Sequence, residues 1–393
     1  MAVGNRCANR DYADFYVISV IGGWLSYVNI LQISSASSFG GGERYVVDLT
    51  NALVSRGHDV YVAVRPGSPL PRHLQLPPEK IVTLPLRNAV DVPSARELEK
   101  LVRQKEIDVV HAHMARDYSL ASYAARRKQT KFIVTRHVLF KLNRLHRHTL
   151  SRATRVIAVS NAVARELRAS QIVGDRQIAV IHNGIDVDRI QKTGTEIHRE
   201  PYLRSIGIAV DGPLVGSIGE LRTLKRHDDF IHAAALILKE FPETQFVLAG
   251  VDTSPSGEVR KQLEKLVAEL GLADRFHFLG WLDEAAKLLC AMDVFVSASE
   301  TESFGLAIVE AMAAGTAVVA TATEGASEVI EDQKTGFLVP IGDVKQLAQS
   351  VINLLSDPEK RRTIAAQSVQ SVAKKFSLNR MVDEIERVYL AAD

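Results

Sequence analysis

Two glutamates frame a short segment of the sequence, ESFGLAIVE, which covers residues 302–310. A Phe-Gly pair and a run of apolar residues lie between Glu302 and Glu310. A carboxylate is costly to bury without a partner, so two carboxylates in this setting indicate a binding role. Glu310 could instead be a helix-surface carboxylate, which its apolar neighbours disfavour. Glu302 could also complement a helix dipole, and that role is compatible with ligand binding.

The residues before and after these glutamates predict a strand, a loop and a helix in succession. The segment DVFVSAS (293–299) has the composition of a buried strand, and helical periodicity begins near Leu306. The free N–H groups at the start of a helix bind anions such as phosphate. Gly305 has no side chain and therefore lets the backbone approach a ligand closely.

The chain alternates short β-branched runs with amphipathic helical patterns, which indicates parallel α/β structure. Strands are predicted in a first series at 29–35, 58–64, 80–86, 107–113, 131–137, 155–160 and 178–184, and in a second at 214–220, 244–250, 276–280, 293–299, 317–321 and 336–340. Helices are predicted at 44–57, 226–240, 257–270 and 306–314, and from about 343 to the end. We therefore expect an α/β fold of two doubly wound, Rossmann-like domains that face each other across a cleft, where such sheets bind ligands.

The domain boundaries follow from the same pattern. We expect residues 1–27 to be an N-terminal extension, because a self-contained first strand begins at Val28. Disorder of this extension is compatible with the sequence. The first domain covers 28–200 and the second 201–375, and the polar text QKTGTEIHRE (191–200) predicts a linker between them. Residues 376–393 are predicted to form a separate C-terminal helix.

Composition limits the classes of protein that fit. Residues 1–200 contain 29 Lys and Arg against 18 Asp and Glu, whereas the remainder contains 19 against 28, although the net charge is only +2. The basic half suggests a phosphate-containing ligand or an anionic membrane surface. Two cysteines without a CxxC motif indicate neither a disulfide framework nor a zinc site, and favour a cytoplasmic location. The apolar stretch 15–31 is at the short limit for a membrane span.

Several enzyme classes lack their motifs. Neither FGGGER (39–44) nor GSIGEL (216–221) has the GxGxxG spacing of a dinucleotide site, and P-loop, GxSxG and HExxH motifs do not occur. Asp186 and Asp188 follow an Asn-Gly turn and are interpreted as residues that stabilise this turn. His111 and His113 form an H-x-H pair without an evident third ligand, so they are expected to be structural or to line an acceptor cleft. No metal or other cofactor is predicted.

The segment ESFGLAIVEAMAAGTAVVAT resembles the E-x7-E signature of family 4 glycosyltransferases, which are retaining enzymes of the GT-B fold. Seven further segments occur in the order and approximate spacing of that family. They are GGGE (40–43), VTRH (134–137), VIAVS (156–160), HNGID (182–186), GELRTLK (219–225), VLAG (247–250) and FLGW (278–281). The resemblance covers roughly residues 29–390 and implies that the first domain binds the acceptor, that the second binds a nucleotide sugar, and that the C-terminal helix crosses back to the first.

The resemblance also implies roles for particular residues. Glu310 would accept hydrogen bonds from both ribose hydroxyls, Glu302 would bind the transferred sugar, and His137 would lie near its anomeric carbon. Lys225 matches the family's diphosphate-binding lysine, whereas the family's arginine position holds Glu220, so Arg222 is the expected replacement. The catalytic set is therefore His137, Glu302 and Lys225. The donor-binding set is Gly41, Gly42, Arg222, Lys225, Gly250, Leu279, Phe304, Gly305, Leu306 and Glu310.

The implied function is transfer of a sugar, with retention, from a UDP- or GDP-sugar to a hydroxyl of a glycan or lipid-linked acceptor, as in synthesis of a cell-envelope polysaccharide or lipopolysaccharide. A sugar-nucleotide epimerase or a sugar phosphorylase of the same fold is an alternative, and so is a non-catalytic glycan-binding protein. No nucleic-acid partner is expected.

The run FKLNRLHRHTLSRATR (140–155) contains five basic residues and no acid, with leucines interleaved. A basic amphipathic helix of this kind can lie on anionic lipid at the inner face of the plasma membrane. A basic helix packed on the first sheet with its charges in solvent accounts for the pattern equally well.

Overall fold

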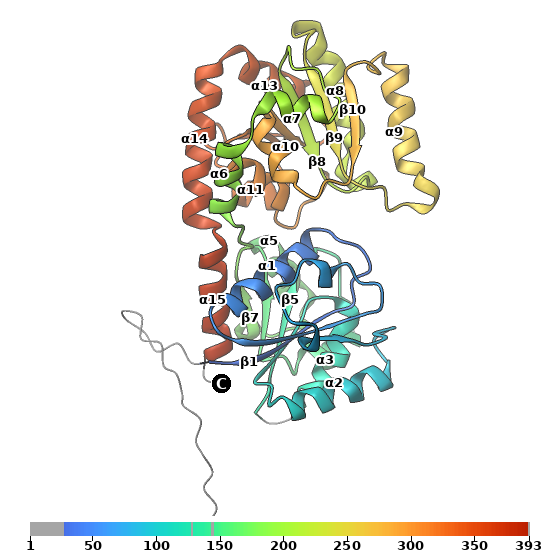
Figure 1. Ribbon diagram of the computed structural model, residues 1–393, viewed down its shortest axis with the longest axis vertical. Coiled ribbons are helices and arrows are strands. Elements are labelled where there is room, and N and C mark those ends of the chain that lie inside the picture. Colours follow the sequence, from blue (N-terminus) through green and yellow to red (C-terminus); the bar gives the residue numbers. More distant parts are fainter. Residues whose placement is uncertain (1–26, 127–128, 143–144, 392–393) are drawn as a thin grey trace, which may run out of the picture.

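The protein is described here by a computed structural model that covers residues 27–126, 129–142 and 145–391, and its two halves each contain one parallel sheet (Figure 1). The first sheet has seven strands in the order β3-β2-β1-β4-β5-β6-β7. They are β1 (Asn29–Ser34), β2 (Asp59–Val64), β3 (Ile81–Thr83), β4 (Val109–Ala112), β5 (Lys131–Arg136), β6 (Arg155–Ala158) and β7 (Ile178–Val180). The strand order reverses between β1 and β4, which is where such sheets bind ligands.

The second sheet has six strands in the order β10-β9-β8-β11-β12-β13. They are β8 (Leu214–Ile218), β9 (Gln245–Ala249), β10 (Phe276–Gly280), β11 (Val294–Ser297), β12 (Ala317–Thr321) and β13 (Phe337–Val339). All the strands predicted in both series are confirmed, because a parallel sheet covered on both faces requires continuous β-branched runs that are visible in the sequence.

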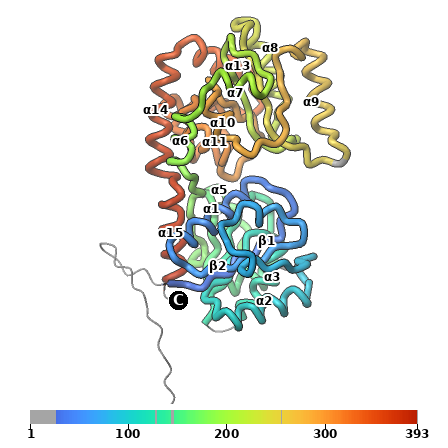
Figure 2. The backbone as a smooth tube through the Cα atoms, viewed as in Figure 1, coloured from blue at the N-terminus to red at the C-terminus, as the bar shows by residue number. Residues whose placement is uncertain are grey.

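Helices cover both faces of each sheet (Figure 2). In the first half these are α1 (Gly41–Ser55), α2 (Val92–Gln104), α3 (Tyr118–Ala124), α4 (Leu145–Leu150) and α5 (Asn161–Ser170). Between the sheets and in the second half they are α6 (Val187–Glu196), α7 (Arg199–Ser205), α8 (His227–Glu240), α9 (Glu258–Glu269), α10 (Ala285–Ala291), α11 (Leu306–Ala313), α12 (Glu324–Val329) and α13 (Val344–Ser356). The chain ends with α14 (Pro358–Lys375) and α15 (Leu378–Leu390). No helix within the described ranges is long and apolar enough to cross a membrane.

Two sequence predictions need correction. The polar segment predicted as a linker is helical, since α6 and α7 occupy most of it. The predicted basic amphipathic helix over 140–155 is wrong, because α4 covers only Leu145–Leu150 and Arg155 already belongs to β6. The membrane contact expected of this segment stays a prediction. Residues 1–26 of the N-terminal extension, and Arg144, lie outside the described residues.

The last helix crosses from the second half of the chain to the first, as predicted, and packs beside α1 (Figure 1). At the crossing, the N–H of Ile185 donates to the carbonyl of Phe376 at 2.9 Å, and Leu378 N–H donates back to Ile185 at 2.8 Å. A Cβ on Gly184 would lie 2.6 Å from the carbonyl oxygen of Ser377, so only glycine fits there. The crossing therefore depends on the NGID segment.

A second contact between the halves joins α12 to the start of α5. The carboxylate of Glu328 accepts hydrogen bonds from the N–H groups of Asn161 at 2.8 Å and Ala162 at 2.7 Å. His182 donates to the same carboxylate at 3.1 Å. Glu328 thus satisfies two of the free N–H groups that open every helix. Burial alone would raise the pKa of Glu328, but these hydrogen bonds hold it below its ordinary value.

Substituting Glu328 by glutamine should lower the stability of the protein, because an amide replaces a carboxylate that accepts several hydrogen bonds. We expect a loss of about 1–3 kcal/mol, measured by thermal or denaturant unfolding at neutral pH. The control is Glu324→Gln on the same helix, since the ion pair of Glu324 with Arg165 at 3.0 Å is exposed and contributes little to stability.

The same pair of variants tests the pH dependence. A depressed carboxylate pKa stabilises the folded state above the unfolded value near 4.5, and this contribution disappears as the pH falls through the folded pKa. The wild-type protein should therefore lose more stability than Glu328→Gln between pH 6 and pH 3. Equal acid sensitivity of the two proteins would contradict the assignment.

Candidate active site

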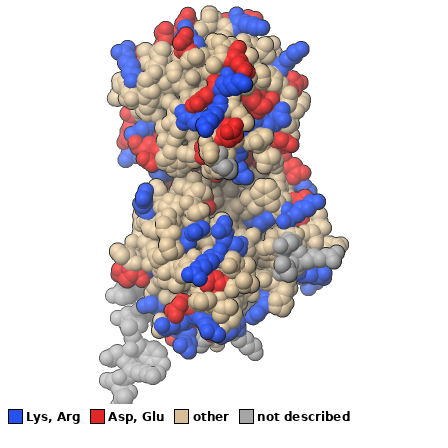
Figure 3. All heavy atoms as spheres, turned by 90° about the vertical axis from the view of Figure 1, so that its right-hand side faces the viewer, with Lys and Arg blue, Asp and Glu red and all other residues tan. Residues whose placement is uncertain are grey.

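The segment after β1 and the segment after β11 meet between the two halves of the molecule, where Figure 3 shows a hollow. On the face shown, Lys and Arg side chains predominate in the N-terminal half (Figure 3). A cavity of about 500 Å³ lies at this junction. It is lined by Ser38 from the first half and, from the second, by residues 220–224, Thr253, Ser254 and Val259.

The glycine-rich loop after β1 lies directly against the second half. A Cβ placed on Gly41 would lie 3.0 Å from the Cδ1 atom of Leu306, at the start of α11. The Phe39 ring meets the Trp281 ring edge-on, with centroids 5.8 Å apart. A side chain at Gly41 would therefore require the Leu306 side chain on the other half to shift by a few tenths of an ångström.

Lys225 and Glu302, which the sequence predicts at one site, are in direct contact. The Nζ atom of Lys225 lies 2.6 Å from the Oε1 atom of Glu302. Ser299 donates to the same oxygen at 2.8 Å. The Glu302 side chain is only 14% exposed, so its position is fixed by these two partners. Lys225 is 29% exposed and can also reach an anion in the hollow.

The segment from Phe304 to Leu306 presents backbone rather than side chains. Gly305 has a φ of +94°, a left-handed conformation that favours glycine, and it immediately precedes α11. The Phe304 side chain is buried against Phe376, with ring centroids 5.5 Å apart. A Cβ on Gly325 would lie within 2.7 Å of the Phe304 nitrogen, so this backbone is packed from behind. The opening N–H groups of α11 follow this packed segment, and N–H groups at the start of a helix can bind an anion.

Glu310 lies on α11 opposite the first half of the molecule. Its Oε1 atom is 3.9 Å from the Nη1 atom of Arg44 on α1. Burial raises the pKa of Glu310, while Arg44 and Arg189 counteract this effect. Asp48, one helical turn after Arg44, has its pKa raised by burial to about 6. Glu310 is therefore a partly buried acceptor with cations nearby, rather than a free surface carboxylate.

His137 directly follows β5 and lies beneath the glycine loop. Its Cγ atom would be 3.9 Å from a Cβ on Gly42. Its ring meets that of Tyr45 edge-on, with centroids 4.7 Å apart. Burial lowers the pKa of His137 to about 3, so the imidazole is neutral at physiological pH. Its Nε2 atom has no hydrogen-bond partner among the described residues.

Glu220 and Arg222 occupy the loop after β8. An Nη1 atom of Arg222 lies 3.3 Å from Glu220 Oε2, and half of the Arg222 side chain is exposed. The other Glu220 oxygen would be 3.4 Å from a Cβ on Gly40 across the cleft. Arg222 thus borders the cavity as expected, but its charge is shared with Glu220.

Two family descriptions match successive parts of the chain: Glycosyltransferase Family 4 over residues 39–189 and Glycosyl transferases group 1 over residues 198–370. Together with the glutamates on α11 and its loop, they decide the classification. The chain belongs to the family 4 glycosyltransferases. It is a retaining glycosyltransferase that uses nucleotide sugars.

Relatives of this glycosyltransferase match it over most of their length. It is 28% identical to the N-acetyl-alpha-D-glucosaminyl L-malate synthase of Bacillus anthracis over 91% of this chain and 96% of that protein. It is 29% identical to the lipopolysaccharide core biosynthesis glycosyltransferase LpsE of Rhizobium meliloti over 88% and 94% of the two chains. The structure of Anabaena HepE with UDP and glucose matches the fold with a TM-score of 0.80, at 22% identity, over 93% of this chain and all of that one. The GT-B fold expected from the sequence is thereby confirmed.

The structure of this glycosyltransferase brings most of the predicted residues to one cleft and adds others. Leu279, a predicted donor-binding residue, lies on β10 two positions before the exposed Trp281, whose ring contacts Phe39. Sequence reasoning missed Arg44 and Ser299, the partners of the two glutamates. Arg44 could have been found from its position in GGGER, one residue after the acid of the glycine loop. Ser299 gave no comparable signal.

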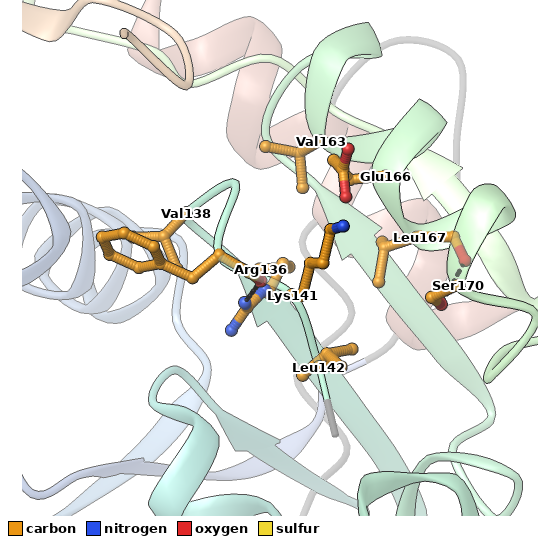
Figure 4. Close-up of a pocket in the computed structure, with 9 residues that line it drawn as sticks. Arg136, Val138, Lys141, Leu142, Val163, Glu166, Leu167 and Ser170 are labelled. Carbon is orange, nitrogen blue, oxygen red and sulfur yellow. Dashed lines mark hydrogen bonds between the residues drawn. The ribbon is translucent and has the colours of Figure 1, made fainter. Parts of the chain in front are cut away.

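A pocket beside the cleft is too small to be the site. The loop after β5 and helix α5 enclose it, and Lys141 extends toward α5 (Figure 4). It is lined by Arg136, Val138, Phe140, Lys141, Leu142, Val163, Glu166, Leu167 and Ser170. Its volume of about 10 Å³ has room for no more than about one water molecule.

Among the predicted donor-site glycines, Gly250 is the one at which the structure most clearly requires glycine. Its φ is +152°, and a Cβ there would lie 1.8 Å from the carbonyl oxygen of Gly219. Gly250→Ala should therefore destabilise the protein by more than about 1 kcal/mol in denaturant unfolding, because the new methyl group meets rigid backbone.

The control for this substitution is Gly207→Ala. Gly207 also has a positive φ, of +75°, but a Cβ there would have no neighbour within 4 Å. The difference between the two variants isolates the contact with Gly219. Equal losses of stability would show that the contact is unimportant.

Proposed function

We propose that this glycosyltransferase transfers a hexose from a UDP-sugar, or alternatively a GDP-sugar, to a hydroxyl of a glycan or lipid-linked acceptor in the synthesis of a cell-envelope polysaccharide or lipopolysaccharide. The observation that carries the proposal is the succession of Lys225, Glu302, the start of α11 and Glu310 along one wall of the cleft. Similarity to LpsE supports the class of acceptor, and similarity to HepE supports UDP.

The arrangement suits transfer by front-face displacement. The oxygen of the acceptor hydroxyl forms a bond to the anomeric carbon on the side from which the diphosphate leaves. The bond from that carbon to the phosphate oxygen breaks, and the hydroxyl proton passes to the departing phosphate. The protein contributes positioning and electrostatic stabilisation. No protein nucleophile is required.

Each predicted residue then binds a particular part of the donor. Lys225 and the opening N–H groups of α11 stabilise the negative charge of the diphosphate. Glu302, held by Ser299, binds hydroxyls of the transferred sugar. Glu310 accepts hydrogen bonds from the ribose hydroxyls, and Arg44 opposes the rise in the pKa of Glu310 that burial causes. Neutral His137 faces the sugar from the first half of the molecule.

A panel of UDP-, GDP- and ADP-sugars tests the proposal through thermal unfolding, because a ligand that binds only the folded state raises its stability. We expect the largest shift with a UDP-sugar. The donor that binds is then incubated with L-malate or with a lipopolysaccharide core oligosaccharide. A glycoside with retained anomeric configuration on the oligosaccharide is the expected product. An epimerised donor without glycoside would instead favour the epimerase.

Glu310→Ala should weaken donor binding, because two hydrogen bonds to ribose are lost. At about 0.5–1.5 kcal/mol for each bond, the Kd of UDP should rise about 5- to 150-fold in calorimetry. Glu359→Ala is the control, since that side chain is 90% exposed on α14. Unchanged UDP affinity in Glu310→Ala would refute the ribose assignment.

A further inference from the structure

One face of the first sheet carries polar side chains where a parallel sheet normally buries aliphatic ones. Gln32 on β1, His111 on β4 and Thr135 on β5 occupy this face, and each is completely buried. Two tyrosines cover them, Tyr45 from α1 and Tyr389 from α15. Together with His113, these residues are called the polar layer below. Its most distant member in sequence is Tyr389, which belongs to the helix that crosses from the other half.

Hydrogen bonds connect the polar layer from α15 to β5. The Nδ1 atom of His111 lies 2.7 Å from the hydroxyl oxygen of Tyr389. The Nε2 atom of His111 lies 2.7 Å from the hydroxyl oxygen of Thr135. The hydroxyl of Tyr45 lies 3.3 Å from the same Thr135 oxygen. Both ring nitrogens of His111 therefore have a hydrogen-bond partner.

Gln32 connects the same tyrosine to His113. Its amide nitrogen donates to the Tyr389 oxygen at 3.4 Å, and its amide oxygen lies 2.6 Å from the Nε2 atom of His113. Because an amide oxygen can only accept, the Nε2 atom of His113 carries the proton. The Nδ1 atom of neutral His113 consequently presents a lone pair.

That lone pair has no partner within the described part of the chain, although His113 is only 5% exposed. Buried polar atoms in folded proteins are nearly always hydrogen-bonded, so an unpaired one needs an explanation. His113 directly follows β4 at the carboxyl edge of the sheet, next to the reversal of strand order. Its ring centroid is 5.9 Å from that of His137 and 5.7 Å from that of Tyr45. His113 therefore lies at the carboxyl edge of the sheet, beside the predicted site residue His137, and its unpaired nitrogen is buried there.

We propose that the Nδ1 atom of His113 is part of the acceptor site and accepts a hydrogen bond from a hydroxyl group of the acceptor. Gln32 and Tyr389 are positioning residues that keep the proton on the opposite nitrogen. The inference rests on the proposed function, since it assigns the acceptor side of the same cleft. A lone pair on a neutral ring repels carboxylate and phosphate oxygens, so the group bound here is a neutral O–H donor, as a sugar supplies.

Burial and the neighbouring histidines make protonation unfavourable. Burial lowers the pKa of His113 well below its ordinary value, and His111 and His137 lower it further. His113 therefore keeps its lone pair throughout the physiological pH range. This distinguishes it from a cationic histidine, which would bind an anionic acceptor group.

Two substitutions at His113 separate the binding of the acceptor by the Nδ1 atom from the structural hydrogen bond between the Nε2 atom and Gln32. In His113→Gln, the longer amide can still donate to Gln32, but nothing replaces the Nδ1 atom. In His113→Asn, the shorter amide can place its oxygen at the Nδ1 position, but it loses Gln32. The assay uses UDP-glucose or whichever donor gave the largest thermal shift, with the acceptor that gave the most product in the same panel.

The proposal expects the acceptor KM to rise at least about tenfold in His113→Gln and less than about threefold in His113→Asn. The Kd of the donor should stay within about twofold in both. A normal acceptor KM in His113→Gln, or a greater effect in His113→Asn, would overturn the proposal, because support through Gln32 would then be the main role. Failure of the wild-type protein to form any glycoside would count against the proposed function instead.

A matched control makes the same histidine-to-glutamine substitution at a histidine of the second sheet. The Nε2 atom of His277 on β10 lies 2.8 Å from the amide oxygen of Gln245, the same type of pair as His113 with Gln32. His277→Gln should leave the acceptor KM unchanged. An effect equal to that of His113→Gln would show that the assay reports general destabilisation, and would overturn the proposal.

Nitrogen NMR of the full chain, with labelled histidine, tests the tautomer without any substrate. The resonances missing in His113→Gln identify this residue. We expect a protonated Nε2 atom and an unprotonated Nδ1 atom at pH 7. A proton on Nδ1 would overturn the proposal regardless of whether the protein transfers a sugar.

Discussion

The position of the two sheets relative to each other depends on a carboxylate that one half of the chain inserts into the other. Glu328 binds N–H groups of the α5 backbone, and not only side chains. Its geometry is therefore tied to β6, which immediately precedes α5. The chain crossing at Gly184 adds a second contact between backbones. Because the site is composed of loops from both sheets, these two contacts help to set the distances across the cleft, together with the contacts of Arg44 with Glu310 and of Phe39 with Trp281.

The parts of this structure that follow from local chemistry could be predicted from the sequence. Strands covered on both faces require β-branched runs, and these runs are visible in a single sequence. Gly305 was recognised because it has no side chain and precedes a predicted helix, and Gly250 because it belongs to the VLAG segment of the family resemblance. Both adopt positive φ angles in the structure. The helix predicted for the basic segment 140–155 is wrong because composition alone did not show where the next strand begins. Its composition suggested one helix, but β6 begins at Arg155 and leaves α4 only six residues.

The contacts between site residues could not be predicted, even where the resemblance placed both residues at one site, because they join residues distant in sequence. Lys225 and Glu302 are 77 positions apart, and His111 and Tyr389 are 278 apart. Nothing in the local pattern shows that Arg44 faces Glu310. His111 and His113 were expected to be structural or to line an acceptor cleft, and the position of α15 in the structure shows that their surroundings differ. His111 has partners on both nitrogens, whereas His113 has one.

The contact between Lys225 and Glu302 reduces the net electrostatic free energy that Lys225 contributes to donor binding. Lys225 already has a carboxylate partner at 2.6 Å. A diphosphate that reaches this lysine must share it with Glu302 or replace it, so binding is an exchange of one ion pair for another. The electrostatic gain is then the difference between two similar attractions, and fewer counterions are released than at an unpaired cation. Ionic strength should accordingly affect the affinity for the nucleotide sugar only weakly.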